Sequence, residues 1–401
     1  MINKEEVIVP QPRLGMTTYV IVLIVMMTVQ WMTLDMYLPA LPVLKTEFGA
    51  SEALLNVSLN SDLLTCAIGM LIGGTISDKY GRNPIMIIGL FLAGIPLLAA
   101  AFSQGVWFLT IMRGFSGMGG GVALTIAAAI VRDSFQGKTF QTITTLTQAA
   151  AIVGPVFAPA IGAFLIEYLS WRWIFIVEGG MSLLTLIPFF FAEETWPKEK
   201  RQVDKVIQAT VQAFEIVKDM KFLCFMGSVM IVTVPLWGYL GVCSYVYYEF
   251  FHVTNLQYVI LYAAGTLISF VAPFMYMFLT RKTSAGNVMV IAMLLLVVAA
   301  GLFALVGDIN PVWFLLAMVP VFLAEGIVRT LSTVEVLDKY HNKAGSASAV
   351  SGFGMLIISV PGTTVATLGW GSFITGLAVI SGASFIAAAI LWIYGRKFIL
   401  S

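Results

Sequence analysis

Residues 73–84 read GGTISDKYGRNP. This short charged stretch stands between two apolar runs, over residues 53–76 and 84–103. Each run has about 20 residues or more, the length that crosses a bilayer as a helix. Gly81 permits a tight turn between them, because glycine adopts backbone conformations that other residues avoid. The stretch therefore predicts two membrane-spanning helices joined by a short charged connection.

The composition of the whole chain indicates a lipid environment. Of the 401 residues, 59% are hydrophobic and only 11% are charged, whereas a soluble domain carries roughly a quarter charged residues. The net charge of +1 gives no basic bias, so we expect no nucleic-acid partner. The three cysteines, Cys66, Cys224 and Cys243, lie inside apolar runs, and an odd number at such positions predicts no disulfide framework.

Apolar runs that are long enough to span a bilayer recur along the chain, and we predict an all-α membrane protein with twelve spans. The predicted spans cover residues 17–40, 53–76, 84–103, 106–130, 141–166, 172–192, 222–247, 256–279, 286–306, 312–336, 345–367 and 370–394. The first run is longer than the core of a cleavable signal sequence, so we interpret it as a span. A long polar linker over residues 193–221 separates an N-terminal six-helix half (1–192) from a C-terminal six-helix half (222–401).

Lysine and arginine predict the orientation, because these residues are retained in cytoplasmic connections. With both termini in the cytoplasm, all but four of the 22 Lys and Arg residues fall in cytoplasmic segments. The exceptions are Lys45 and Arg172 outside, and Arg113 and Arg329 within helices. Two six-helix halves joined by a charged cytoplasmic linker are typical of transporters built from repeats, with a site near the membrane midplane.

Four residues of the opening stretch, Gly74, Asp78, Gly81 and Arg82, resemble the signature of the major facilitator superfamily between its second and third helices. The resemblance implies two six-helix bundles that rock around a central cavity. It also implies that this cluster controls conformational gating: Gly74 allows close helix packing, and Asp78 and Arg82 bind helix ends and opposite charges between the halves.

A second motif lies in the span predicted over 141–166. Gly154, Pro155, Pro159 and Gly162 resemble the antiporter motif of the same superfamily. Proline removes a helix hydrogen bond and kinks the helix, and the resemblance implies a bending point that is found mainly in exporters. A purely structural kink is the alternative.

The end of the first span reads DMYLPALP, starting at Asp35. The start of the span predicted over 172–192 reads WRWIF, counted from Trp171 just before it. Both stretches resemble the bicyclomycin-resistance (Bcr/CflA) group of twelve-span drug:proton antiporters. The resemblance implies proton-coupled efflux across the cytoplasmic (inner) membrane by a monomer.

Ionisable residues within the spans are candidates for proton coupling, because a charge in hydrocarbon costs several kcal/mol and usually faces a cavity. We expect Asp35 and Arg113 to share one layer, with Asp35 as the proton carrier and Arg113 lowering its proton affinity by its positive charge. Asp62 either joins this layer as a second carboxylate, or is shallow and faces water, which we favour. A structural ion pair is the alternative reading of Asp35 and Arg113.

Further acids lie in other spans. Glu325 and Arg329 are four residues apart and can pair on one helix face, as a second proton or substrate site or as a packing ion pair. Glu178 is interpreted as structural, since the sixth helix of the superfamily is usually peripheral.

Aromatic side chains attract organic cations, and six of them are candidates to line a substrate cavity. These are Trp31, Tyr37, Trp237, Tyr239, Tyr245 and Tyr262. Packing against lipid or protein is the alternative for each of them.

No phosphate-binding loop, histidine-based metal centre or catalytic set is present in the sequence, so we predict neither an enzyme nor a cofactor, with the proton gradient as energy source. The predicted function is proton-coupled efflux of small drug-like molecules. The alternative is a dedicated exporter of a native metabolite, such as an amino acid or sugar derivative.

Overall fold

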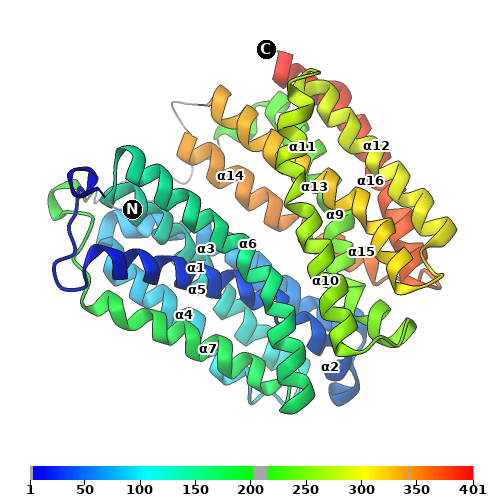
Figure 1. Cartoon of the computed structure of the whole chain (residues 1–401), viewed down its shortest axis with the longest axis horizontal. Coiled ribbons are helices and arrows are strands. Elements are labelled where there is room, and N and C mark those ends of the chain that lie inside the picture. Colours follow the sequence, from blue (N-terminus) through cyan, green and yellow to red (C-terminus); the bar gives the residue numbers. More distant parts are fainter. Residues whose placement is uncertain (1–2, 202–214, 341–343, 401) are drawn as a thin grey trace. The chain divides into compact units, whose positions relative to one another are not determined.

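The computed structural model describes residues 3–201, 215–340 and 344–400 (Figure 1). These residues are helical apart from loops and one isolated antiparallel bridge between Val7 and Phe135. The N-terminal elements are η1 (Lys4–Glu6), α1 (Met16–Asp35), η2 (Leu38–Ala40), α2 (Leu41–Phe48), α3 (Glu52–Tyr80), α4 (Arg82–Ala100), α5 (Val106–Ser134), α6 (Gly137–Tyr168), α7 (Arg172–Leu186), η3 (Ile187–Phe190) and η4 (Lys198–Lys200). The C-terminal elements are η5 (Glu215–Lys218), α9 (Met220–Tyr245), the π-helical turn η6 (Val246–Phe250), α10 (Asn255–Ser269), α11 (Val271–Thr280), α12 (Ala285–Val306), α13 (Pro311–Lys339), α14 (Ala344–Ile357), α15 (Ser359–Ala366) and α16 (Phe373–Leu400).

Among the described residues, eleven helical segments are long and apolar enough to cross a bilayer. They correspond to eleven of the twelve predicted spans. The remaining span, predicted over 345–367, is divided into α14 and α15. Part of the predicted linker, residues 202–214, lies outside the described part of the chain. The chain is therefore a multi-pass membrane protein.

Two helix breaks that were not predicted have the same cause. α10 ends at Ser269 and α14 ends at Ile357, and in each case a proline follows four residues later, at Pro273 and Pro361. A proline lacks the amide that would bond the carbonyl four residues before it, and its ring crowds that carbonyl. The break at each position follows from this missing hydrogen bond.

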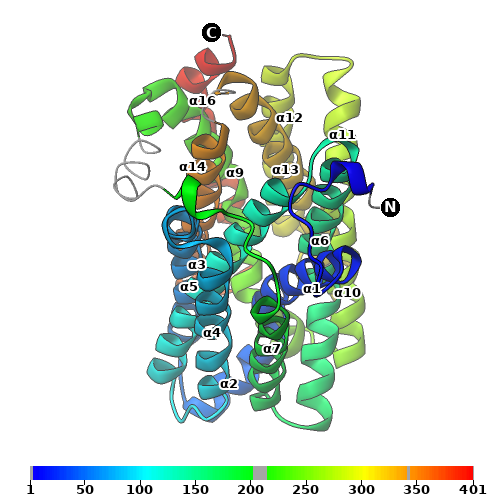
Figure 2. The same ribbon diagram turned by 90° about the vertical axis from the view of Figure 1, so that its left-hand side faces the viewer.

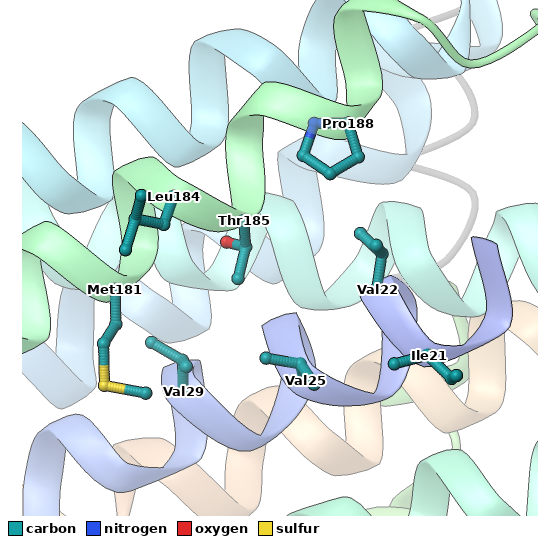
Figure 3. A pocket seen from close by; sticks show the side chains of 8 residues that line it. All are labelled: Ile21, Val22, Val25, Val29, Met181, Leu184, Thr185 and Pro188. Carbon is teal, nitrogen blue, oxygen red and sulfur yellow. The ribbon is translucent and has the colours of Figure 1, made fainter. Parts of the chain in front are cut away.

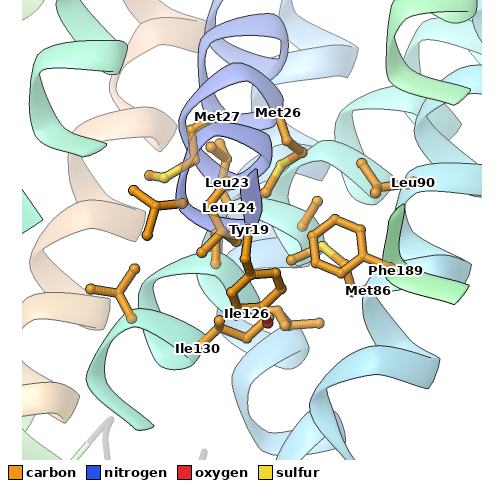
Figure 4. Packing of buried hydrophobic residues seen from close by; sticks show 14 of the residues in the cluster. Tyr19, Leu23, Met26, Met27, Met86, Leu90, Leu124, Ile126, Ile130 and Phe189 are labelled. Carbon is orange, nitrogen blue, oxygen red and sulfur yellow. The ribbon is translucent and has the colours of Figure 1, made fainter. Parts of the chain in front are cut away.

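The described helices form two compact units, of which unit 1 comprises Met1–Ala40 and Ser61–Val211. Its core is a cluster of buried apolar side chains (Figure 4). The cluster includes Tyr19, Leu23, Met26 and Met27 from α1, Met86 and Leu90 from α4, Leu124, Ile126 and Ile130 from α5, and Phe189 from η3. α4 packs along α5, as Figure 2 also shows, and along α7, while α1 packs along α6.

Unit 2 comprises Leu41–Asn60 and Gln212–Ser401, so it includes the first two turns of α3. α9 packs against α15 and α16, and α12 packs against α13 and α16. Two buried asparagines fix the start of α3 in this unit: the Asn56 amide donates to the Gly241 carbonyl at 3.0 Å, and the Thr363 hydroxyl donates to Asn60 Oδ1 at 2.6 Å.

Large apolar side chains cover much of the outer surface. On α4, Ile88, Phe91 and Ile95 are exposed and repeat at the spacing of one helix face. An apolar outer face of this kind suits lipid rather than water, since monomeric soluble proteins rarely expose large contiguous apolar patches.

Candidate functional site

Buried polar side chains of unit 1 gather at one level of the bundle. Along α1 the buried residues change from apolar at Tyr19–Met27 to polar at Thr33 and Asp35. Along α5 they run from polar at Thr110–Ser116 to apolar at Val122–Val131. Because α1 and α5 share the apolar core cluster, their polar stretches also meet at one level.

Arg113 lies at the centre of this polar level. Its side chain is 0% exposed, and its Nη2 is 3.7 Å from Asp62 Oδ2 on α3. Its guanidinium also stacks on the Tyr37 ring, 4.2 Å from the centroid. Asp35 is the last residue of α1, two residues before Tyr37, and is 6% exposed. The structure thus places Asp35, Asp62 and Arg113 in one buried layer of unit 1.

The expectation that Asp62 faces water is wrong. Asp62 is 6% exposed, although it lies only about three turns from the start of α3. The reason is the close packing of α5 on α3: a Cβ atom on Gly117 or Gly121 would collide with the backbone of Asp62 or Cys66. Helices that meet through glycine allow their backbones to approach closely. These glycines therefore serve helix packing, and this packing brings Asp62 to Arg113.

The antiporter-like motif packs on the same helix that carries Asp35. α6 is one continuous helix that contains Pro155 and Pro159. A Cβ atom on Gly154 would lie 2.9 Å from the Thr28 carbonyl of α1, and one on Gly162 would collide with the Met36 carbonyl. Any bending of α6 at this motif is therefore transmitted to α1 through direct backbone contact.

The turn between α3 and α4 is a dense charged cluster. Gly81 has φ of 103°, in the region that favours glycine. The Arg82 side chain is 1% exposed and pairs with Asp78 at 2.6 Å and Asp133 at 2.8 Å. Its amide donates to Glu194 Oε1 at 2.8 Å. These partners of Arg82 all belong to unit 1, and a Cβ atom on Gly74 would lie 3.3 Å from the Thr125 side chain of α5.

Comparison with known proteins gives the family. The sequence model described as Major Facilitator Superfamily matches residues 23–363, which is most of the chain. The chain belongs to the major facilitator superfamily. The predicted resemblance to this superfamily is thereby confirmed, and the protein is a transporter of this fold.

The transporter has curated relatives of similar length. The uncharacterized MFS-type transporter YdgK of Bacillus subtilis strain 168 is 26% identical over 88% of this chain and 91% of its own. The multidrug resistance protein MdtL of Shewanella sp. strain ANA-3 is 26% identical over 81% of this chain and 82% of its own.

Solved transporters share its fold at lower identity. The nucleoside transporter NupG has a TM-score of 0.75 and 13% identity, covering 94% of this chain and 98% of its own. The partially occluded, inward-open xylose transporter XylE from E. coli has a TM-score of 0.71 and 17% identity, covering 93% and 96%. At these identities the likeness shows the fold alone.

Unit 2 of the transporter contains the predicted ion pair of Glu325 and Arg329. Glu325 and Arg329 pair on α13, with Arg329 Nε donating to Glu325 Oε1 at 2.6 Å. Glu325 is 5% exposed, whereas the Arg329 side chain is 64% exposed. The cation is thus accessible while its partner is buried.

The aromatic candidates are packed inside the two units. Tyr239 contacts Phe314 and Phe322, and Tyr245 contacts Phe373. In unit 1, Tyr37 contacts Phe175 and Arg113, and Trp31 is half-buried beside the core cluster. Trp237 and Tyr262 are also buried.

A pocket of about 270 Å³ lies between α1 and α7 (Figure 3). It is lined by Ile21, Val22, Val25, Val29, Met181, Leu184, Thr185 and Pro188. The lining is apolar apart from the Thr185 hydroxyl, and none of the predicted cavity residues contributes to it. We therefore do not assign substrate binding to this pocket.

The sequence did not predict Gln30, Asp133 or Glu194 at the polar level and at the turn, and Glu178 was interpreted as structural. Gln30 of α1 donates to the Ser182 hydroxyl of α7 at 3.2 Å, and Glu178, one turn before Ser182, is 2% exposed. Asp133 and Glu194 complete the Arg82 cluster. Glu178 carried a readable signal, an acid isolated in an apolar run, which is the same signal that marked Asp35.

Proposed function

We propose that this transporter exports small drug-like molecules in exchange for protons, by alternating access across the cytoplasmic (inner) membrane. The observation that carries the proposal is the buried layer of Asp35, Asp62 and Arg113 in unit 1. An ionisable cluster inside a membrane bundle is costly and marks an ion or proton pathway. The multidrug resistance relatives support a drug-like substrate class, and we propose that the chain belongs to the Bcr/CflA group that its sequence resembles.

The layer supplies a simple exchange. Two carboxylates, Asp35 and Asp62, and one guanidinium lie buried at this level, so full ionisation leaves one surplus negative charge in a poorly solvated place, which costs several kcal/mol. Either a proton or a cationic substrate neutralises that charge. Protonation from outside and displacement of the proton by a drug from inside then couple the two fluxes. A proton is bound and later released, and no covalent bond of the drug changes.

Two other features support movement between states. We propose that Gly74, Asp78, Gly81 and Arg82 latch one state through the charged turn, and that Gly154, Pro155, Pro159 and Gly162 form the bending point of α6. Glu325 is a second candidate proton site. The six aromatic candidates contribute to a substrate cavity, and the transporter acts as a monomer with both termini in the cytoplasm.

The test is ethidium efflux from cells that lack their own pumps. Wild type, Asp35→Asn, Asp62→Asn and Arg113→Ala are compared with and without a protonophore. Asp308→Asn, which makes the same isosteric change at an exposed acid, is the control. We expect the protonophore to abolish wild-type efflux, Asp35→Asn and Arg113→Ala to abolish it without protonophore, and Asp308→Asn to behave as wild type.

Each unexpected outcome removes a defined part of the proposal. Active efflux by Asp35→Asn would show that another acid carries the proton. Wild-type efflux that survives the protonophore would remove proton coupling. A wild type that moves no ethidium would favour the dedicated metabolite exporter.

A further inference from the structure

Glu178 is a buried acid of unit 1 to which the proposed exchange gives no role. It lies on α7 and is 2% exposed. Both of its carboxylate oxygens are buried, and neither has a hydrogen-bond partner among the described residues. A buried carboxylate that is ionised normally accepts several hydrogen bonds, because an unpaired buried charge is strongly unfavourable. This carboxyl group therefore lacks the surroundings of a permanently charged structural residue.

The neighbours of Glu178 on α7 fix the direction in which it points. Phe175, three residues earlier, packs against Tyr37 with ring centroids 5.8 Å apart. Ser182, four residues later, accepts a hydrogen bond from Gln30 of α1. Residues at these spacings share one helix face. Glu178 thus faces the stretch of chain between Gln30 and Tyr37, which contains Asp35.

The glycine beside Glu178 holds α7 close to the bundle. A Cβ atom on Gly179 would lie 2.8 Å from the Gly94 carbonyl of α4, and one on Gly94 would lie 2.7 Å from the Leu183 side chain. This packing leaves little freedom for α7 to turn Glu178 outward. The carboxyl group is held at the polar level rather than at the lipid surface.

The charged groups that face Glu178 come from α3 and α5. It interacts electrostatically with Arg113 and Asp62, and Asp35 lies in the stretch of α1 and the following turn that Glu178 faces. α4 has no ionisable residue after Arg82 at its start, and the ionisable residues of α6, Lys138, Glu167 and Tyr168, lie near its two ends. The polar level of unit 1 therefore contains three acids, Asp35, Asp62 and Glu178, and one permanent cation, Arg113.

We propose that Glu178 is a third proton-binding carboxyl group of this level, which titrates together with Asp35 and Asp62 around Arg113. The inference rests on the proposed proton exchange at the same site. With three acids and one arginine, full ionisation would leave two surplus negative charges in a dry layer, so protons are held within the set. Glu178 keeps its proton as a neutral carboxylic acid while Arg113 is paired with Asp62. When water enters the layer, the O–H bond of Glu178 breaks, the proton leaves to water, and the carboxylate is balanced by Arg113.

The test measures protonation directly, apart from drug transport. Purified transporter in lipid is studied by infrared difference spectroscopy between mildly acidic and mildly alkaline pH, where a protonated carboxyl group has its own carbonyl band. Glu178→Gln should lose one component of the titrating band, and Glu178→Asp should shift it. Glu167→Gln, the same change at an exposed acid of α6, should leave the titrating band of the buried acids unchanged.

Ethidium efflux in the same variants gives the second readout. Glu178→Gln should reduce protonophore-sensitive efflux about tenfold, within the usual range of coupling between two sites, whereas Glu178→Asp should retain part of it. A titrating band in Glu178→Gln identical to that of wild type would overturn the proposal, whatever the transport result. If the Gln variant does not fold, an unshifted band in Glu178→Asp would overturn it. If the wild type shows the Glu178 component of the titrating band but moves no ethidium, the proton site is supported and ethidium efflux is refuted.

Discussion

Replacing Gly117 by alanine should force α3 and α5 apart at the level of the Asp62–Arg113 ion pair. The new Cβ atom would collide with the carbonyl of Asp62, and a backbone atom cannot move aside as a flexible side chain would. The two helices must separate by roughly 1 Å before an ordinary contact distance is restored. The distance from Arg113 Nη2 to Asp62 Oδ2, now 3.7 Å, would increase by about the same amount.

The energetic effect has three parts. Alanine favours the helix over glycine by about 1 kcal/mol, overpacking costs about 1–3 kcal/mol, and lengthening the buried ion pair costs about 1 kcal/mol at an effective dielectric constant near 20. The net loss of stability is about 2 kcal/mol. For a bundle of this size that corresponds to a decrease of about 4 °C in melting temperature, and the weaker pair should reduce efflux about fivefold.

Gly114→Ala is the matched control on the same helix. A Cβ atom at Gly114 would lie 3.8 Å from its nearest neighbour, the Thr65 side chain, which is an ordinary contact. We expect Gly114→Ala to melt at or above the wild-type temperature and to pump normally. Intrinsic tryptophan fluorescence of the purified protein and ethidium efflux in cells measure both effects. Equal melting temperatures and equal efflux for the two alanine variants would refute the packing argument.

Two further predictions concern the ends of helices in unit 1. Glu6 accepts hydrogen bonds from the side chain and amide of Thr139 at 2.6 and 2.8 Å, and these lower the pKa of its carboxyl group below the ordinary 4.5. The stabilisation from the Glu6 carboxylate is therefore complete above pH 4.5 and is lost as the pH falls through the lowered pKa. Glu6→Gln should reduce the melting temperature at neutral pH but not in acid. An equal reduction in melting temperature at neutral and at acidic pH would contradict this. Gly81→Ala should destabilise the α3–α4 turn by about 1 kcal/mol or more, because alanine is strained at the positive φ of this position. Gly105→Ala should not destabilise the protein, because Gly105 has an extended backbone and open space around it. Indistinguishable melting curves for the two variants would contradict backbone strain at position 81.

The sequence predicted the helices and the family well because both depend on local patterns. Apolar runs of spanning length identified eleven of the spans that the structure has. The two unpredicted breaks, at Ser269–Phe270 and Ile357–Ile358, follow a rule that was also readable in the sequence, since Pro273 and Pro361 stand four residues later. Other prolines, such as Pro235 and Pro320, lie in helices that continue past them. Tertiary packing decides whether a proline breaks a helix or is accommodated in it.

What the sequence determined by itself is therefore the set of helices, their membrane environment and the identity of the charged residues within them. An isolated acid in an apolar run is visible in the sequence because the apolar residues around it show that it lies within the bilayer, where a charge is costly. Only the tertiary structure decided which of these acids meet. The close glycine contacts between α3 and α5 hold Asp62 beside Arg113, and the packing of α7 on α4 orients Glu178 toward α1. Those contacts depend on the crossing of helices that are distant in sequence, and no periodicity within one helix records them.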